Sequence, residues 1–258
     1  FGVKNSSIGE YNSFSQYTII LFMLLSGINF NLHYYFIKRR LFKILKDEEL
    51  RLYLMIIVGF TVTIALSLIF IQGRSIEPSF RSALFQVVSI LSCTGFITDD
   101  YLVWPQFSWL LIFALMFVGG CAGSTSGGIK VIRHVIMFKA FKAHFYKLIH
   151  PNSIKSIKYN GKTIEDINQV FIFILFYIFI FGISTLLLSF NGVDLITGMG
   201  ATTATMGGIG PGLGSVGSIY NYNHLPDFSK IILSFNMLLG RLELFPLLLM
   251  FSPAFWKR

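Results

Sequence analysis

The chain has 258 residues, of which 54% are hydrophobic and only 13% charged, and its mean hydropathy is +0.68. A soluble domain carries about 25% charged residues, so this composition excludes an ordinary water-soluble protein and predicts one that lies in a membrane. The net charge of +9 is compatible with nucleic-acid binding. In so apolar a chain it indicates basic cytoplasmic loops instead, and no nucleic-acid partner is expected.

Long apolar runs mark the expected spans, because about 20 residues cross the hydrocarbon core. Four such runs cover residues 17–37, 52–71, 170–190 and 231–255. A further run, 107–118, is too short and meets a stretch of Gly and Ser, after which a helical pattern resumes at 129–149. We expect one broken span there.

Two shorter segments, 79–91 and 194–205, each end in a glycine-containing tract. They are too short to cross the membrane, so we predict re-entrant half-helices that dip in from the outside. The chain therefore repeats a unit of span, half-helix, glycine tract and span. Parallel repeats of this kind predict an all-α membrane protein whose units surround one ion pore.

The distribution of charge gives the orientation. Most of the 21 basic residues follow the inward ends of the spans, which makes that side cytoplasmic. These residues are Lys38, Arg39, Arg40, Lys43, Lys46, Arg51, Lys130, Arg133, Lys139, Lys142, Lys147, Lys155, Lys158, Lys162, Lys257 and Arg258. The outer side carries more acidic than basic residues, and this excess of negative charge favours the approach of cations. The basic, Phe-rich stretch 130–147 predicts either a helix at the lipid headgroups or a docking surface for a regulatory partner.

The two glycine tracts read SCTGFITDD and TMGGIGPGLG. Glycine allows backbone angles that turn successive carbonyls to one side, and a ring of carbonyls can replace the hydration shell of potassium. Each half-helix also points its partially negative C-terminus toward the pore centre. A glycine-rich turn between packed helices is the alternative, which two equivalent tracts disfavour. The predicted ion-filter residues are Cys93, Thr94, Gly95, Phe96, Thr205, Met206, Gly207 and Gly208.

A third tract, GGCAGSTSGG, interrupts the broken span. Its many Gly and hydroxyl residues disfavour a helix, so we predict a gating loop below the filter. Helix packing of the GxxxG kind is an alternative, since Gly119 and Gly123 have that spacing. A phosphate loop is rejected, because Gly128 is followed by Ile129 rather than by the required Lys. The predicted gating-loop residues are Gly119, Gly120, Cys121, Ala122, Gly123, Ser124, Thr125, Ser126, Gly127 and Gly128.

Arg241 lies near the middle of the last expected span, where a charge is costly and by default functional. We predict that it faces the pore, where its positive charge opposes leak or tunes flux. An ion pair with another helix is the alternative. Glu243 lies on a different helix face, and Pro246 is expected to kink the helix. Cys93 and Cys121 have no metal-type spacing, so neither a disulfide nor a zinc site is expected.

These motifs resemble the Trk/Ktr/HKT potassium transporter superfamily, closest to its TrkH-type pore subunits. FQVVSILSCTGFITDDY resembles the third filter region, GGCAGSTSGGIKVIR the intramembrane gating loop and ATTATMGGIGPGLG the fourth filter. SGINFNLHYY resembles the inner helix of the second repeat, and MLLGRLELFPLLL the last pore-lining helix. Two departures are visible: Cys93 stands where Thr or Ser is usual, and Gly208 where Asn is usual.

The resemblance implies four repeats around one pore, of which this chain, a C-terminal fragment, holds the later ones. Residues 1–50 are then the end of the second repeat, 51–162 the third and 163–258 the fourth. Phe1, which is not Met, is then the last filter residue of the second repeat. The resemblance further implies a homodimer and a cytosolic, nucleotide-binding regulatory subunit that acts on the gating loop.

The expected function is potassium uptake across the cell membrane by a multi-pass protein, with potassium as the transported ion and no organic cofactor. A sodium-permeable or sodium-coupled relative is the alternative. A membrane enzyme is disfavoured, because the spans carry no convergent acid, base or metal set beyond Arg241 and Glu243. A structural scaffold is disfavoured, because it has no need of duplicated re-entrant loops.

Overall fold

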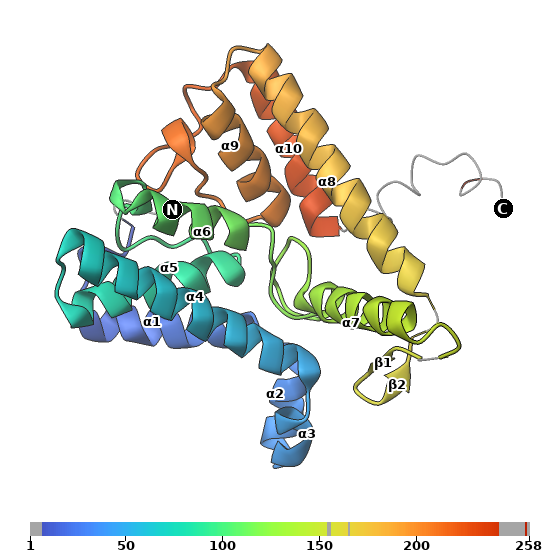
Figure 1. Cartoon of the computed structure of the whole chain (residues 1–258). Helices are drawn as coiled ribbons and strands as arrows, with labels where there is room; N and C mark the ends of the chain where they lie inside the picture. The colour runs from blue at the N-terminus through green and yellow to red at the C-terminus, as the bar shows by residue number, and fades with distance from the viewer. Residues whose placement is uncertain (1–6, 154–155, 165, 243–255, 257–258) are drawn as a thin grey trace.

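The computed structural model describes residues 7–153, 156–164, 166–242 and 256. Within these residues the regular secondary structure is helical apart from one short β-hairpin (Figure 1), which confirms the predicted fold class. The elements in chain order are α1 (Ser13–Ser26), α2 (Phe30–Ile37), α3 (Leu41–Leu45), α4 (Glu48–Gln72), α5 (Ile76–Leu91), η1 (Tyr101–Val103), α6 (Gln106–Leu115), α7 (Val131–Ile149), β1 (Lys158–Tyr159), β2 (Lys162–Thr163), α8 (Ile167–Phe190), α9 (Leu195–Gly207), η2 (Gly214–Val216) and α10 (Asp227–Leu242).

Two of the described helices, α4 and α8, are long and apolar enough to cross a membrane by themselves, each with a mean hydropathy of 2.7 over its most apolar stretch. Both leave large apolar side chains exposed, such as Val58 and Phe70 on α4 and Leu175 and Phe179 on α8. Lipid can cover these side chains, which agrees with the spans expected at 52–71 and 170–190.

The span expected at 17–37 is not one continuous helix. α1 and α2 meet at an angle of 102° across a break of three residues. At this break the Gly27 carbonyl accepts a hydrogen bond from the Cys121 N–H at 2.9 Å, and the Phe30 N–H donates to the Gly123 carbonyl at 3.4 Å. A distant segment thus satisfies backbone groups that the break exposes, a contact that the apolar periodicity of 17–37 does not reveal.

The span–half-helix unit occurs twice. The half-helix α5 packs against α4, and α9 packs against α8 and α10, so the two units form two groups of helices in Figure 1. α9 starts at a side-chain cap, since Asp194 accepts a hydrogen bond from the Thr197 N–H at 3.0 Å. Hydrogen bonds from Thr197 also hold the pKa of the exposed Asp194 below its usual value.

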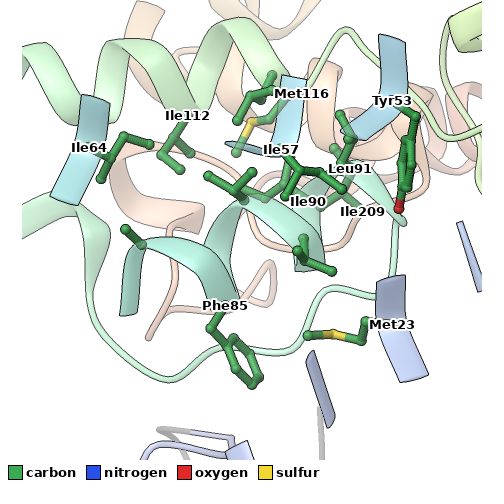
Figure 2. Packing of buried hydrophobic residues seen from close by; sticks show 14 of the residues in the cluster. Met23, Tyr53, Ile57, Ile64, Phe85, Ile90, Leu91, Ile112, Met116 and Ile209 are labelled. Carbon is green, nitrogen blue, oxygen red and sulfur yellow. The ribbon is translucent and has the colours of Figure 1, made fainter. Parts of the chain in front are cut away.

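A buried apolar core joins the units (Figure 2). Its largest cluster combines side chains of α1, α4, α5 and α6 with Ile209 and Leu213 of the second glycine tract. The hydroxyl group of Tyr101 in η1 also donates to the Gly212 carbonyl. The second tract is therefore fixed to the first unit by apolar burial and by a buried hydrogen bond.

A β-hairpin absent from the sequence expectations connects α7 with α8. β1 and β2 are antiparallel and pair Lys158 with Thr163 and Tyr159 with Lys162. Asn160 and Gly161 form the turn, with φ angles of 46° and 82°. Positive φ at both positions is the type I′ geometry that Asn-Gly favours in two-residue hairpins.

Close packing of α10 on α9 depends on Gly240. A Cβ atom added there lies 2.0 Å from the Met206 carbonyl oxygen, whereas one added at Gly182 in α8 meets nothing within 4 Å. We predict that Gly240→Ala destabilises the full-length protein by about 1–3 kcal/mol through overpacking, and that the matched Gly182→Ala does not. Thermal unfolding in detergent measures both, and a Gly240→Ala variant that unfolds at the wild-type temperature contradicts the close packing.

Candidate functional site

The first glycine tract begins where α5 ends. Cys93 has a φ of 55°, and the Thr94 N–H donates to the Ser89 carbonyl at 3.0 Å. A left-handed residue followed by this long-range bond is the usual way to end a helix. The left-handed conformation itself is uncommon for a residue other than Gly, such as Cys93. The turn reverses the chain, and Gly95 follows with a φ of 76°.

The second tract repeats this geometry. α9 ends at Gly207, Gly208 has a φ of 65°, and the Ile209 N–H donates to the Ala204 carbonyl at 2.9 Å. Gly208 therefore corresponds to Cys93, and Gly210, with a φ of 106°, corresponds to Gly95.

This register shows which residues of the second tract lie beyond the helix. Thr205, Met206 and Gly207 belong to the last turn of α9, and of the predicted residues in the second tract only Gly208 lies beyond the helix. Ile209, Gly210 and Pro211 follow in the positions equivalent to Thr94, Gly95 and Phe96. The sequence prediction did not include these three residues. The alternation of glycines in GGIGPG was the available signal.

Both tracts carry unbonded carbonyl groups. Within the described residues, the carbonyl oxygens of Cys93, Thr94 and Gly95 accept no hydrogen bond, and neither do those of Gly208 and Ile209. Buried carbonyls are normally paired with a donor. Gly95 and Ile209 are buried. A row of carbonyls that lacks donors suits a cation, which can supply the missing electrostatic partner.

The next carbonyl of each row is held by the protein. Ser89 Oγ donates to the Phe96 carbonyl at 2.7 Å, and the Tyr222 hydroxyl donates to the Gly210 carbonyl at 2.7 Å. A cavity of about 660 Å³ opens beside the second tract, and its lining includes Thr205, Gly208 and Gly210. The second row therefore borders an open space.

The segment 119–128 is non-helical and lies between α6 and α7. Its ends are joined, because the Gly119 N–H donates to the Ile129 carbonyl at 2.9 Å and the Ile129 N–H donates to the Phe117 carbonyl at 3.3 Å. Inside the loop, Ser126 Oγ accepts from the Gly120 N–H at 2.8 Å and lies 2.8 Å from Ser124 Oγ. Hydroxyl groups thus replace the hydrogen bonds that a helix supplies.

This loop touches both glycine tracts. The Gly127 N–H donates to Cys93 Sγ at 3.3 Å. A Cβ atom added at Gly127 lies 2.3 Å from the Gly207 carbonyl oxygen. The loop therefore lies directly against the ends of α5 and α9, with room for hydrogen alone at Gly127.

Arg241 of α10 also meets the loop, since its guanidinium group donates to the Thr125 carbonyl. Lys130 donates in the same way to the Ser126 carbonyl. Two positively charged side chains therefore bind carbonyl groups of the loop. The partner of Arg241 in this contact is the loop backbone. Glu243 and Pro246, together with Phe1, lie outside the described residues.

Long apolar helices in a mostly helical fold define the class as a multi-pass, all-α membrane protein. Comparison with known proteins gives the family. The profile of the TrkH family, described as cation transport protein, matches residues 1–258. The chain belongs to this family.

Relatives of known name support this assignment. The chain is 37% identical over 264 residues to the Trk system potassium uptake protein TrkH of Escherichia coli K12 and 34% identical over 262 residues to that of Halomonas elongata. Both alignments cover 100% of the chain and 54% of the relative. The chain therefore spans about half the length of these relatives.

A solved structure has the same fold. The crystal structure of the potassium transporter TrkH from Vibrio parahaemolyticus matches with a TM-score of 0.91 at 33% identity. The match covers 100% of this chain and 56% of that one. A multi-pass position in the cell membrane follows from the family and from the apolar helices.

The fit of Gly127 gives a test of the loop position. We predict that Gly127→Ala in the full-length protein displaces the loop, because the added methyl group meets backbone atoms that cannot yield. Cys93 then becomes more reactive toward a small charged thiol reagent, measured in a Cys121→Ser background. Thr125→Ala is the control, since Thr125 is exposed and its carbonyl is retained. Equal reactivity in the Gly127→Ala variant and wild type contradicts the contact.

Proposed function

We propose that this chain forms part of a pore for potassium uptake across the cell membrane. The observation that carries the proposal is the pair of equivalent carbonyl rows at the ends of α5 and α9. The names of the Escherichia coli and Halomonas elongata relatives, both potassium uptake proteins, support the choice of ion. Potassium is the transported substrate, and no organic cofactor is proposed for this chain.

The filter acts by replacing water. Carbonyl oxygens of Cys93, Thr94 and Gly95 on one side, and of Gly208 and Ile209 on the other, coordinate a dehydrated potassium ion. The C-terminal ends of α5 and α9 both lie against Gly127, and their partial negative charge favours a cation. Thr205, Met206 and Gly207 support the second row from the last turn of α9, while Phe96 and Gly210 end the rows.

The gating loop, residues 119–128, is the barrier beneath the filter. Its contacts with Cys93 and Gly207 support this role, because they hold Gly127 directly against the ends of both half-helices. Arg241 strengthens the barrier in two ways. It holds the Thr125 carbonyl, and its positive charge opposes a cation at that depth.

The remaining proposals follow from the family resemblance. Residues 1–50, 51–162 and 163–258 form parts of the second, third and fourth pore repeats. The complete protein is a homodimer, with membrane lipid around it and a cytosolic nucleotide-binding subunit that moves the gating loop. The basic helix α7 supports the last point, because it leads from the gating loop to the cytoplasmic hairpin.

The filter is tested by ion selectivity. We predict that Gly95→Ser and Gly210→Ser in the full-length protein weaken discrimination between potassium and sodium, because positive φ strains any side chain there and re-aims a coordinating carbonyl. Reversal potentials in reconstituted bilayers measure the permeability ratio. Gly73→Ala is the control, since Gly73 has a φ of 65° at the end of α4 with nothing within 4 Å of an added Cβ. Unchanged ratios in both Ser variants contradict the filter assignment.

The gate is tested by deletion. We predict that removal of residues 122–127 from the full-length protein raises potassium flux, because the joined ends at Gly119 and Ile129 remain while the barrier is lost. Selectivity stays the same, since the carbonyl rows are untouched. Isotope uptake into proteoliposomes measures the flux, and size-exclusion chromatography checks folding. A folded deletion variant with wild-type or lower flux shows that the loop is not the barrier.

A further inference from the structure

Glu49 is a buried carboxyl group that the proposed pore does not use. It is the second residue of α4, at the cytoplasmic end of that span, and only 1% of its surface is exposed. A carboxyl group this deeply buried is costly unless hydrogen-bond donors surround it. The partners of Glu49 therefore indicate what it does.

Two backbone amides from different elements donate to the same oxygen of Glu49. The Ala122 N–H lies 2.6 Å from Oε1, and the Ile132 N–H lies 2.9 Å from it. Ala122 belongs to the gating loop and Ile132 to the first turn of α7. One oxygen atom therefore joins the loop to the helix that follows it.

The bond to Ile132 also completes α7. The residue before this helix, Lys130, makes no side-chain capping bond, so the first amides of α7 depend on another acceptor. A carboxyl group at a helix N-terminus is favoured by the helix dipole. Glu49 thus acts as a cap supplied by α4, and a shift of α7 away from α4 breaks it.

The residues next to Glu49 bind the start of α4 to the hairpin and to α7. Asp47 caps α4 at the Leu50 N–H, 2.8 Å away, and accepts a second bond from Asn160 Nδ2 at 2.8 Å. Glu48 pairs with Lys139 of α7. The Tyr159 hydroxyl lies 3.5 Å from Glu49 Oε2. Burial and the nearby acidic groups raise the pKa of Tyr159, so its phenol stays protonated and can donate.

We propose that Glu49 is a positioning residue that latches the gating loop, because its carboxyl group ties the loop at Ala122 to the first turn of α7 at Ile132. The loop is released when α7 or the hairpin moves relative to α4. This inference rests on the proposed function of the loop as a gate, and it identifies the contact through which a cytoplasmic movement reaches that gate.

Ala122→Pro tests the latch without changing Glu49. Residues 121–124 form a hydrogen-bonded turn, with the Ser124 N–H donating to the Cys121 carbonyl at 3.1 Å and Gly123 at a φ of 70°. Ala122 has no positive φ, so the turn is of type II, in which Pro is common at the second position. The variant therefore removes the N–H that binds Glu49 and places a ring methylene group where the Glu49 carboxylate oxygen lies, so this oxygen must leave Ala122. Ala122→Ser is a matched control that keeps this N–H.

Two measurements on the reconstituted full-length protein follow. We expect potassium flux to rise about tenfold in Ala122→Pro. A change of this size corresponds to the loss of one hydrogen bond to a buried polar acceptor. We expect hydrogen–deuterium exchange to rise in residues 119–134 in both Ala122→Pro and Glu49→Ala. The double variant Glu49→Ala/Ala122→Pro is expected to show no higher flux and no faster exchange than Glu49→Ala alone. Glu49→Gln, which keeps an acceptor oxygen, is expected to show flux and exchange near those of the wild type.

The outcomes separate the two ideas. Folded Ala122→Pro protein with wild-type exchange and flux overturns the latch, as do additive effects in the double variant. Wild-type protein that carries no potassium flux overturns the proposed function, and hydrogen exchange then decides the latch by itself. Faster exchange in Ala122→Pro, with Ala122→Ser unchanged, supports the latch whether or not Glu49→Ala folds.

Discussion

Backbone polar groups at membrane depth need partners, and this constraint shapes the centre of the protein. Non-helical backbone survives in the bilayer only where protein or a water-filled cavity satisfies it. The break between α1 and α2 and the loop 119–128 satisfy each other through Gly27 and Cys121 and through Phe30 and Gly123. Two irregular segments that are each unfavourable alone are therefore stable as a pair.

The glycine tracts meet the same constraint differently. Each half-helix ends in a left-handed residue, and the amides there bond some of the last helix carbonyls. The carbonyls that follow have no partner among the residues that the structure describes. Tyr101 and Tyr222 then bind the Gly212 and Gly210 carbonyls from outside the row. The free carbonyls are thus a defined set, and the surrounding hydrogen bonds keep them from rotating toward other donors.

The sequence predicted the elements better than the contacts between them. Apolar runs located α4 and α8, and shortness combined with glycine identified α5 and α9 as half-helices, because length and composition are local properties. The break at Gly27 was missed, since its cause is a bond from Cys121. In the second tract, α9 includes Gly207 and ends before Gly208. The sequence does not show this boundary, because glycines at 207 and 208 look alike until the φ angles are known. The Asn160–Gly161 pair is a local signal for the hairpin and was overlooked. Glu49 had no such signal, because the amides that bind its carboxyl group are distant in sequence.

The joined ends of the loop 119–128 have a consequence for how this segment can vary. Bonds between Gly119 and Ile129 and between Ile129 and Phe117 connect α6 to α7 at the base of the loop, so this connection does not depend on the length of the segment between them. Closing a longer loop over a fixed base costs little, about 0.6 kcal/mol for each doubling of length. Related proteins are thus free to differ in the size of this segment by insertion, while their helices keep the same positions.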